Sequence, residues 1–222
     1  MKKFLRILDT LLWLITGCIF MYGLFISVRQ EDGRMSFTLL SSLECILMMY
    51  GALVCFLSFL YQRKRSQGMF APVLRCSVFL SITGWCLYGL IFLKGHYSLY
   101  PSSLQKGIEM MRIGALCLVM EWVIAEKGHF WKHFTWSGMF IFVIYCTVAL
   151  IAGAMGHGIG IGGHAYPYPF LDMDLLGWQI VIPNVILLLV ELWVYDRIWI
   201  GIDRLLKRKV KKHDKEIRTG SV

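Results

Sequence analysis

The sequence predicts an all-α membrane protein with six transmembrane helices. The chain has 222 residues, of which 57% are hydrophobic and only 17% are charged, and its mean hydropathy is +0.61. A soluble domain is about half apolar and about a quarter charged, so this composition indicates a membrane protein. A spanning helix needs about 20 mostly apolar residues. Runs of this kind lie at approximately Leu5–Val28, Phe37–Tyr61, Ala71–Leu93, Ile108–Ala125, Phe134–Met155 and Gln179–Ile200.

Basic residues gather on one side of these runs. They precede the first run, lie between the second and third and between the fourth and fifth, and follow the sixth. The positive-inside rule places this side, with both termini, in the cytoplasm. This orientation explains the formal charge of +9, so no nucleic-acid partner is predicted. The basic residues concerned are Lys2, Lys3, Arg6, Arg63, Lys64, Arg65, Lys127, Lys132, Arg204, Lys207, Arg208, Lys209, Lys211, Lys212, Lys215 and Arg218.

The six runs leave little chain for a soluble domain. We predict a transmembrane domain over residues 1–203 and a basic cytoplasmic tail over residues 204–222, which can also attract anionic lipid. The first run is longer than the apolar core of a signal peptide and lacks a small-x-small cleavage site, so we predict a retained helix. Asp9 lies near its cytoplasmic end, in reach of Arg6.

Hydroxyl side chains open the second run. Thr38, Ser41, Ser42 and Cys45 recur at spacings of three and four, so they share one face of the predicted helix. Such hydroxyls either bond to carbonyls of their own or a neighbouring helix, or include a nucleophile. The spacing by itself leaves both interpretations open.

Few ionisable side chains lie inside the runs. Glu44 and Glu191 are predicted to lie deepest, either as functional groups or as carboxyl groups that are protonated or bonded to a neighbouring helix. Glu121 lies near the cytoplasmic boundary, where Lys127 can meet it. The cysteines fall within the runs without a CxxC pair, so no disulfide framework is predicted. They are Cys18, Cys45, Cys55, Cys76, Cys86, Cys117 and Cys146.

The segment from Gly156 to Asp174 reads GHGIGIGGHAYPYPFLDMD and separates the last two runs. Its two Tyr-Pro steps prevent a continuous helix. Such a backbone cannot face lipid, and its aromatic rings suit the membrane boundary, so we predict a non-cytoplasmic cap packed on the helices. The G-x-G-x-x-G pattern at 158–163 follows a membrane-length helix rather than a strand, so no dinucleotide cofactor is predicted. No metal site is predicted either.

Two motifs carry a resemblance to a known family. The chain has Phe-Thr-x-x-Ser-Ser at the start of the second run and Tyr-Pro-Tyr-Pro-Phe-Leu-Asp before the sixth. With six spans, it resembles the bacterial predicted six-helix integral membrane proteins. These group with the androgen-induced and androgen-dependent membrane proteins of animals, which hydrolyse fatty acid esters of hydroxy fatty acids. The resemblance covers nearly the whole chain and implies a multi-pass protein of a bacterial cell membrane.

The resemblance implies Thr38 as the nucleophile but provides no base. The family's His lies about ten residues before an acidic residue late in the fourth helix, a position that falls on Met111 here, beside Arg112. A Thr hydroxyl needs a base within hydrogen-bond reach, which neither Met nor Arg supplies. His157 and His164 are the alternative bases on the same side of the membrane.

The sequence therefore predicts a pocket for a lipid-like ligand at the outer end of the helices, with degenerate hydrolase chemistry. An anionic head group is expected because of Arg112. Two alternatives stay open: an active threonine esterase with a different base, and a structural membrane protein without ligand. Membrane lipid and a fatty-acyl ligand are the predicted partners. Besides Thr38, the candidate site residues are Ser41, Ser42, Met111, Arg112, Tyr166, Tyr168 and Asp172.

Overall fold

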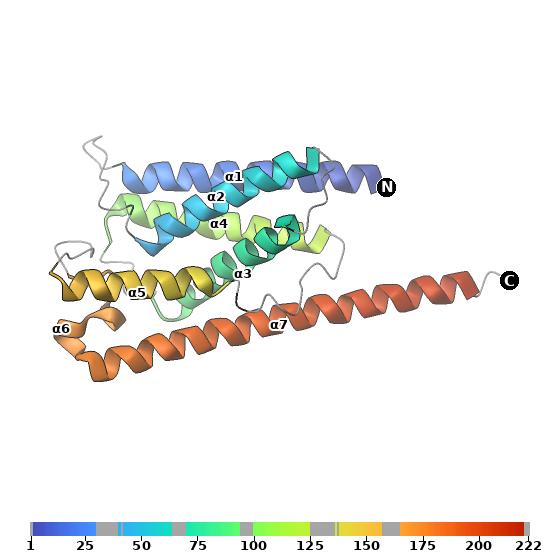
Figure 1. Cartoon of the computed structure of the whole chain (residues 1–222). Coiled ribbons are helices and arrows are strands. Elements are labelled where there is room, and N and C mark those ends of the chain that lie inside the picture. Colours follow the sequence, from blue (N-terminus) through green and yellow to red (C-terminus); the bar gives the residue numbers. More distant parts are fainter. Residues whose placement is uncertain are drawn as a thin grey trace.

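The computed structural model of the chain consists of α-helices joined by short segments (Figure 1). It describes residues 2–29, 40, 42–63, 70–93, 100–124, 136, 138–156 and 165–219. Within these ranges there is no β-strand, which confirms the all-α prediction. The elements are α1 (Lys2–Val28), α2 (Leu43–Arg63), α3 (Phe70–Ile91), α4 (Ser102–Ile124), α5 (Phe140–Ala154), the 3₁₀ turn η5 (Pro169–Leu171), α6 (Met173–Leu176) and α7 (Trp178–Thr219).

Three of the helices are long and apolar enough to cross a membrane. The spanning stretches are Ile7–Val28 in α1, Leu43–Leu60 in α2 and Val73–Ile91 in α3, and α5 is a shorter apolar helix. Large apolar side chains also face outward, as at Leu116 and Ile186, which are 66% and 55% exposed. Lipid rather than water suits such a surface. The chain is therefore a membrane protein.

Close contact between α1 and α4 forms the most extensive helix pair, followed by α1 with α2. Small residues line the first pair: a Cβ added at Gly107 would meet the Ser27 hydroxyl and lie 2.9 Å from the carbonyl oxygen of Gly23. Ser103 donates to the carbonyl oxygen of Ser27 at 3.4 Å. Small residues let helix backbones approach closely in membranes, where dispersion contacts and hydrogen bonds drive association.

Several helices begin at residues other than those predicted, among them α1 at Lys2 rather than Leu5 and α5 at Phe140 rather than Phe134. α2 begins at Leu43 rather than Phe37, because the Ser42 hydroxyl accepts a hydrogen bond from the Cys45 amide at 3.4 Å and caps the first turn. Ser42 thus precedes the helix and does not belong to a polar face on it. α4 begins at Ser102, directly after Pro101 and earlier than the predicted Ile108.

The last helix joins two predicted parts of the chain. α7 has 42 residues and contains Pro183, and it continues without a break from the sixth run into the basic tail as far as Thr219. α5, by contrast, has 15 residues and spans about 22 Å. Figure 1 shows both termini at one end of the molecule and α6 at the other.

Candidate functional site

The first turn of α2 places a carboxyl group inside the protein. Glu44 has no exposed surface, and the Tyr168 hydroxyl donates to its Oε2 at 2.7 Å. Its Oε1 has no hydrogen-bond partner in the part of the chain that the structure describes. The hydrogen bond joins the start of α2 to the Tyr-Pro-Tyr-Pro segment, more than 120 residues later in the sequence.

The Trp85 indole of α3 lies beside this carboxyl group. Its buried Nε1 lies close enough to interact with this carboxyl group, although outside the distance and angle limits of a regular hydrogen bond. The Trp85 ring stacks on Tyr88 at 5.4 Å, contacts Phe142 at 5.5 Å and meets Tyr168 edge-on at 5.5 Å. Glu44, Trp85 and Tyr168, called the Glu44 site below, thus combine three polar groups within aromatic surroundings.

Residues 165–171, called the cap segment below, hold Tyr168 in place. The ring of Tyr166 is buried against α5, where a Cβ added at Gly153 would collide with it. Burial raises the pKa of Tyr166, as do the nearby charges of Asp174 and Asp172, so its hydroxyl stays protonated at neutral pH. Leu171 is fully buried at the end of the segment. This described part of the loop packs on the helices, as predicted for a cap.

The predicted site residues fall into three groups. Thr38, Ser41, His157 and His164 lie outside the described residues. Ser42 and Asp172 cap helices: Asp172 accepts from the amides of Asp174 and Leu175, at 3.1 and 3.0 Å, at the start of α6. Tyr166 and Tyr168 are buried in the cap segment. Of these candidates, Tyr168 forms a hydrogen bond with a buried carboxyl group, that of Glu44.

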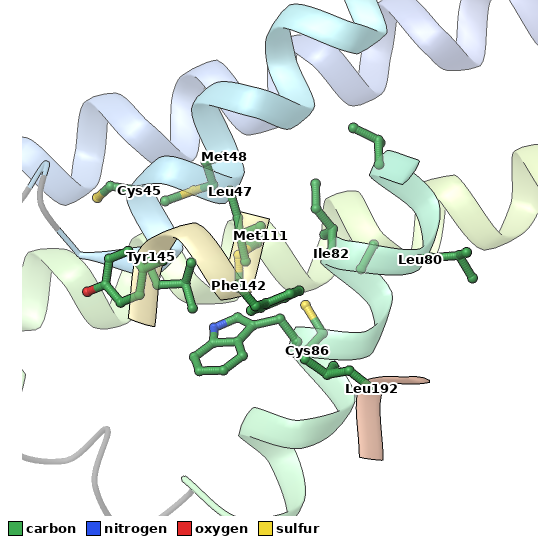
Figure 2. Packing of buried hydrophobic residues seen from close by; sticks show 14 of the residues in the cluster. Cys45, Leu47, Met48, Leu80, Ile82, Cys86, Met111, Phe142, Tyr145 and Leu192 are labelled. Carbon is green, nitrogen blue, oxygen red and sulfur yellow. The ribbon is translucent and has the colours of Figure 1, made fainter. Parts of the chain in front are cut away.

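Met111, predicted to stand where the family's base would be, belongs to the hydrophobic core. It is 1% exposed, and it shares one buried cluster with Leu47, Phe142 and Tyr168. Figure 2 shows Met111 among the side chains of Leu47 and Phe142. Arg112 follows on α4 and is half-buried. A thioether in these surroundings packs well but cannot serve as a base.

A second polar cluster joins α1, α3 and α4. Asp9 accepts from Trp13 Nε1 at 3.1 Å and pairs with Arg75 at 3.8 Å. The Arg75 guanidinium lies 4.8 Å from the centre of the Trp13 ring. Glu121 interacts electrostatically with both Asp9 and Arg75. Arg6 was the predicted partner of Asp9 and Lys127 that of Glu121. Their side chains lie outside the described part, and Arg75 was not predicted.

Sequence reasoning also missed a buried carboxyl group on α7. Asp196 is 1% exposed, whereas Glu191, expected to lie deepest with Glu44, is half-exposed. Asp196 is four residues after buried Leu192 and four before buried Ile200, so the periodicity of a helix places it on the inward face. Glu191 was predicted from its depth in the membrane, and depth does not indicate which face of α7 a residue occupies.

Other sequence predictions concern cysteines, metals and relatives. All seven cysteines are free, as predicted. No group of three or more potential metal ligands occurs within the described ranges. Comparisons with protein-family models, curated proteins and solved structures find no match to this chain. The residues of the Glu44 site offer hydrogen-bond donors, Tyr168 and Trp85, and a carboxyl group.

Proposed function

We propose that the chain crosses the membrane six times with both termini in the cytoplasm. The three remaining apolar runs overlap α4, α5 and α7, which supports spans additional to those of α1, α2 and α3. The two termini share one end of the molecule in Figure 1, as an even number of spans requires. The Lys and Arg residues near that end support a cytoplasmic location.

Cysteine labelling tests this topology. Asp174→Cys on α6 is expected to react with a membrane-impermeant maleimide in intact cells, because Asp174 is exposed near the non-cytoplasmic end. Lys207→Cys on α7 is expected to react only after the cells are opened. The comparison uses a cysteine-free background in which both variants are otherwise identical. Labelling of Lys207→Cys in intact cells, or of Asp174→Cys only in opened cells, contradicts the proposed orientation.

We propose that the protein binds a lipid-like ligand with an acyl chain at the non-cytoplasmic end of the helices. The observation that carries this proposal is the Glu44 site, which buries a carboxyl group, an indole and a hydroxyl group among apolar side chains. Buried polar groups normally have hydrogen-bond partners, and intramembrane carboxyl groups are functional candidates by default. The apolar and aromatic side chains around the site suit the chain of an amphiphile.

Two residues bear on the polar head group of this ligand, Arg112 and Glu44. Arg112, next to Met111 on α4, favours an anionic head, as expected from the sequence. Glu44 adds a buried carboxyl group that can form hydrogen bonds to a polar head. We therefore propose an acyl ligand and assign its polar head to the Glu44 site.

A photoactivatable fatty-acyl probe tests binding. The protein in lipid nanodiscs is expected to crosslink the probe, with adducts on peptides from α2, α3 or the cap segment. Glu44→Gln is expected to lower the yield, while Glu109→Gln, which alters an exposed carboxyl group on α4, is the matched control. No crosslinking above that of an unrelated membrane protein contradicts the proposal. That result favours a structural protein whose interior is filled by its own side chains.

We further propose that the chain belongs to the six-helix family that it resembles but has little or no ester-hydrolase activity. Buried Met111 supports this proposal, because general-base assistance contributes about 10²- to 10⁴-fold and a thioether cannot provide it. A fluorophosphonate probe is therefore expected not to label Thr38. Labelling of the natural chain that disappears in Thr38→Ala contradicts the proposal, and His157→Ala and His164→Ala then identify the base. Met111→His asks whether a base at this position restores labelling.

A further inference from the structure

We infer that the outward face of α7 binds the phosphate of an anionic membrane lipid at the end of its apolar stretch. This inference rests on the proposed crossing of the membrane by α7 and concerns surface residues that the acyl-ligand proposal does not use. Trp193, Arg197, Gly201 and Arg204 carry it, and they are called the α7 lipid site below. Successive members are three or four residues apart, so all of them lie along one face of the helix.

The α7 lipid site lies where the apolar part of α7 gives way to its basic part. Asp203 accepts a hydrogen bond from Trp122 at 3.3 Å, which places it level with the last turn of α4. Arg204 follows Asp203, and Arg197 lies about 10 Å nearer the membrane centre, since the two are seven residues apart at about 1.5 Å each. These positions match the boundary between acyl chains and head groups, where lipid phosphates lie.

This face of α7 is open. Arg197 is exposed and Arg204 is half-buried, and a Cβ added at Gly201 between them would have no neighbour within 4 Å. Figure 1 shows α7 along the edge of the helix bundle, with its C-terminal part extending beyond α3 and α4. Apolar side chains beside the site are exposed as well, as at Ile198 and Leu205. A lipid can therefore reach the arginines and also find an apolar surface for its acyl chains.

The two arginines lack an anionic partner in the part of the chain that the structure describes. No ion pair joins Arg197 or Arg204 to a carboxylate there. The acidic residues that precede them, Asp196 and Asp203, are each 1% exposed and lie on the inward face of α7. A guanidinium stays charged, and a charge at the edge of a membrane is costly unless it is paired. A lipid phosphate is the anion that a membrane supplies at this depth.

Trp193 orients the guanidinium of Arg197, whose central carbon lies 4.9 Å from the centre of the indole ring. Cation–π stacking uses the face of the guanidinium, so its N–H groups, which lie in the plane, can still donate to a phosphate. Paired hydrogen bonds of this kind are stronger and more directional than the contact of a lysine ammonium. Because two arginines contribute two positive charges, a head group that is negative overall is preferred to a zwitterionic one.

Photocrosslinking in nanodiscs tests this preference. Phosphatidylglycerol and phosphatidylcholine probes with the same photoactivatable acyl chain are added separately, at low mole fraction, to phosphatidylcholine nanodiscs. The phosphatidylglycerol probe is expected to label α7 peptides from residues 190–205 at least about fivefold more, the factor typical of one basic residue near an anionic lipid. Arg197→Gln is expected to lower this yield about fivefold and to leave the phosphatidylcholine yield unchanged.

Three further variants separate the site from charge alone. Arg29→Gln removes an exposed arginine directly after α1, and as the matched control it is expected to keep the natural preference. Arg197→Lys keeps the charge but loses the stacked, planar donors, so the phosphatidylglycerol yield is expected to fall. Gly201→Leu places a side chain between the arginines and is expected to lower the same yield. Equal losses in Arg197→Gln and Arg29→Gln overturn the inference.

The two probes also separate this inference from the topology on which it rests. If both probes label α7 equally in the natural chain, the crossing of the membrane by α7 stands and phosphate recognition is wrong. If neither probe labels α7, this helix does not face lipid and the proposed crossing fails as well. Both leaflets of a nanodisc contain the probe, so the outcome does not depend on the orientation, which cysteine labelling tests separately.

Discussion

Gly107→Ala is expected to lower the free energy of unfolding by about 2–3 kcal/mol, the upper part of the range for overpacking. The added methyl group would meet Ser27 Oγ and lie 2.9 Å from the backbone oxygen of Gly23. The Ser27 side chain can rotate, but the α1 backbone moves only if the helices separate. Since α1 and α4 form the most extensive helix pair, that separation disturbs the centre of the fold.

Gly201→Ala on α7 is the matched control for this prediction. Nothing lies within 4 Å of a Cβ added at Gly201. The same substitution there adds the same methyl group to a helix and is expected to stabilise it by up to about 1 kcal/mol, from helix propensity alone. Reversible unfolding in mixed detergent micelles measures both variants. Equal stabilities for the two substitutions contradict the close packing of α1 on α4.

Tyr168→Ala is expected to cost about 3–5 kcal/mol, as large-to-small changes at buried aromatic residues do. The ring is 1% exposed and contacts Trp85, Phe170 and Tyr145 at centroid distances of 5.5, 5.4 and 6.2 Å. Its loss removes these contacts and leaves Glu44 Oε2 without its donor. The cap segment is therefore expected to detach. Faster proteolysis of the variant near Leu171 in detergent would measure this detachment.

The hydrogen bond alone can be separated from the ring. Tyr168→Phe keeps the aromatic contacts and removes the hydroxyl, so it is expected to cost about 1–3 kcal/mol by leaving a buried acceptor unpaired. Combined with Glu44→Leu, which removes the acceptor, the same change is expected to cost much less. Tyr22→Ala, at a position 59% exposed on α1, controls for aromatic loss. Additive effects of the Tyr168 and Glu44 substitutions contradict the contact between them.

Apolar runs of spanning length predicted some helix boundaries closely, although α5 begins six residues after the start of its run. α1 ends at Val28 and α3 begins at Phe70, within one residue of the sequence prediction. The starts of α2 and α4 differ because a capping Ser and a preceding Pro, not hydropathy, decide where the first turn forms. Hydropathy gives no information about hydrogen bonding at helix ends, so boundaries of this kind need the local capping chemistry as well.

The candidate site was predicted only in part. Glu44 was singled out for its depth, and Tyr168 for its place in the Tyr-Pro-Tyr-Pro segment, but no sequence pattern indicated that they bond to each other. Trp85 was not among the predicted site residues, and a tryptophan in an apolar run is typical of packing or of a membrane boundary. Met111 was identified by its offset from Glu121, and its burial in the core shows what a thioether does at that position.

The sequence by itself determined that this is an all-α membrane protein, because composition and hydropathy record how much of each segment avoids water. It also determined that the cysteines stay free and that the Tyr-Pro-Tyr-Pro segment interrupts helix formation. Only the tertiary structure decided which polar groups meet. Tyr168 reaches Glu44, and Arg75 reaches Asp9, across long sequence separations, through contacts set by how the helices pack. Packing depends on close-fitting residues such as Gly107 and Gly153, and hydropathy does not distinguish their roles from those of any other glycine.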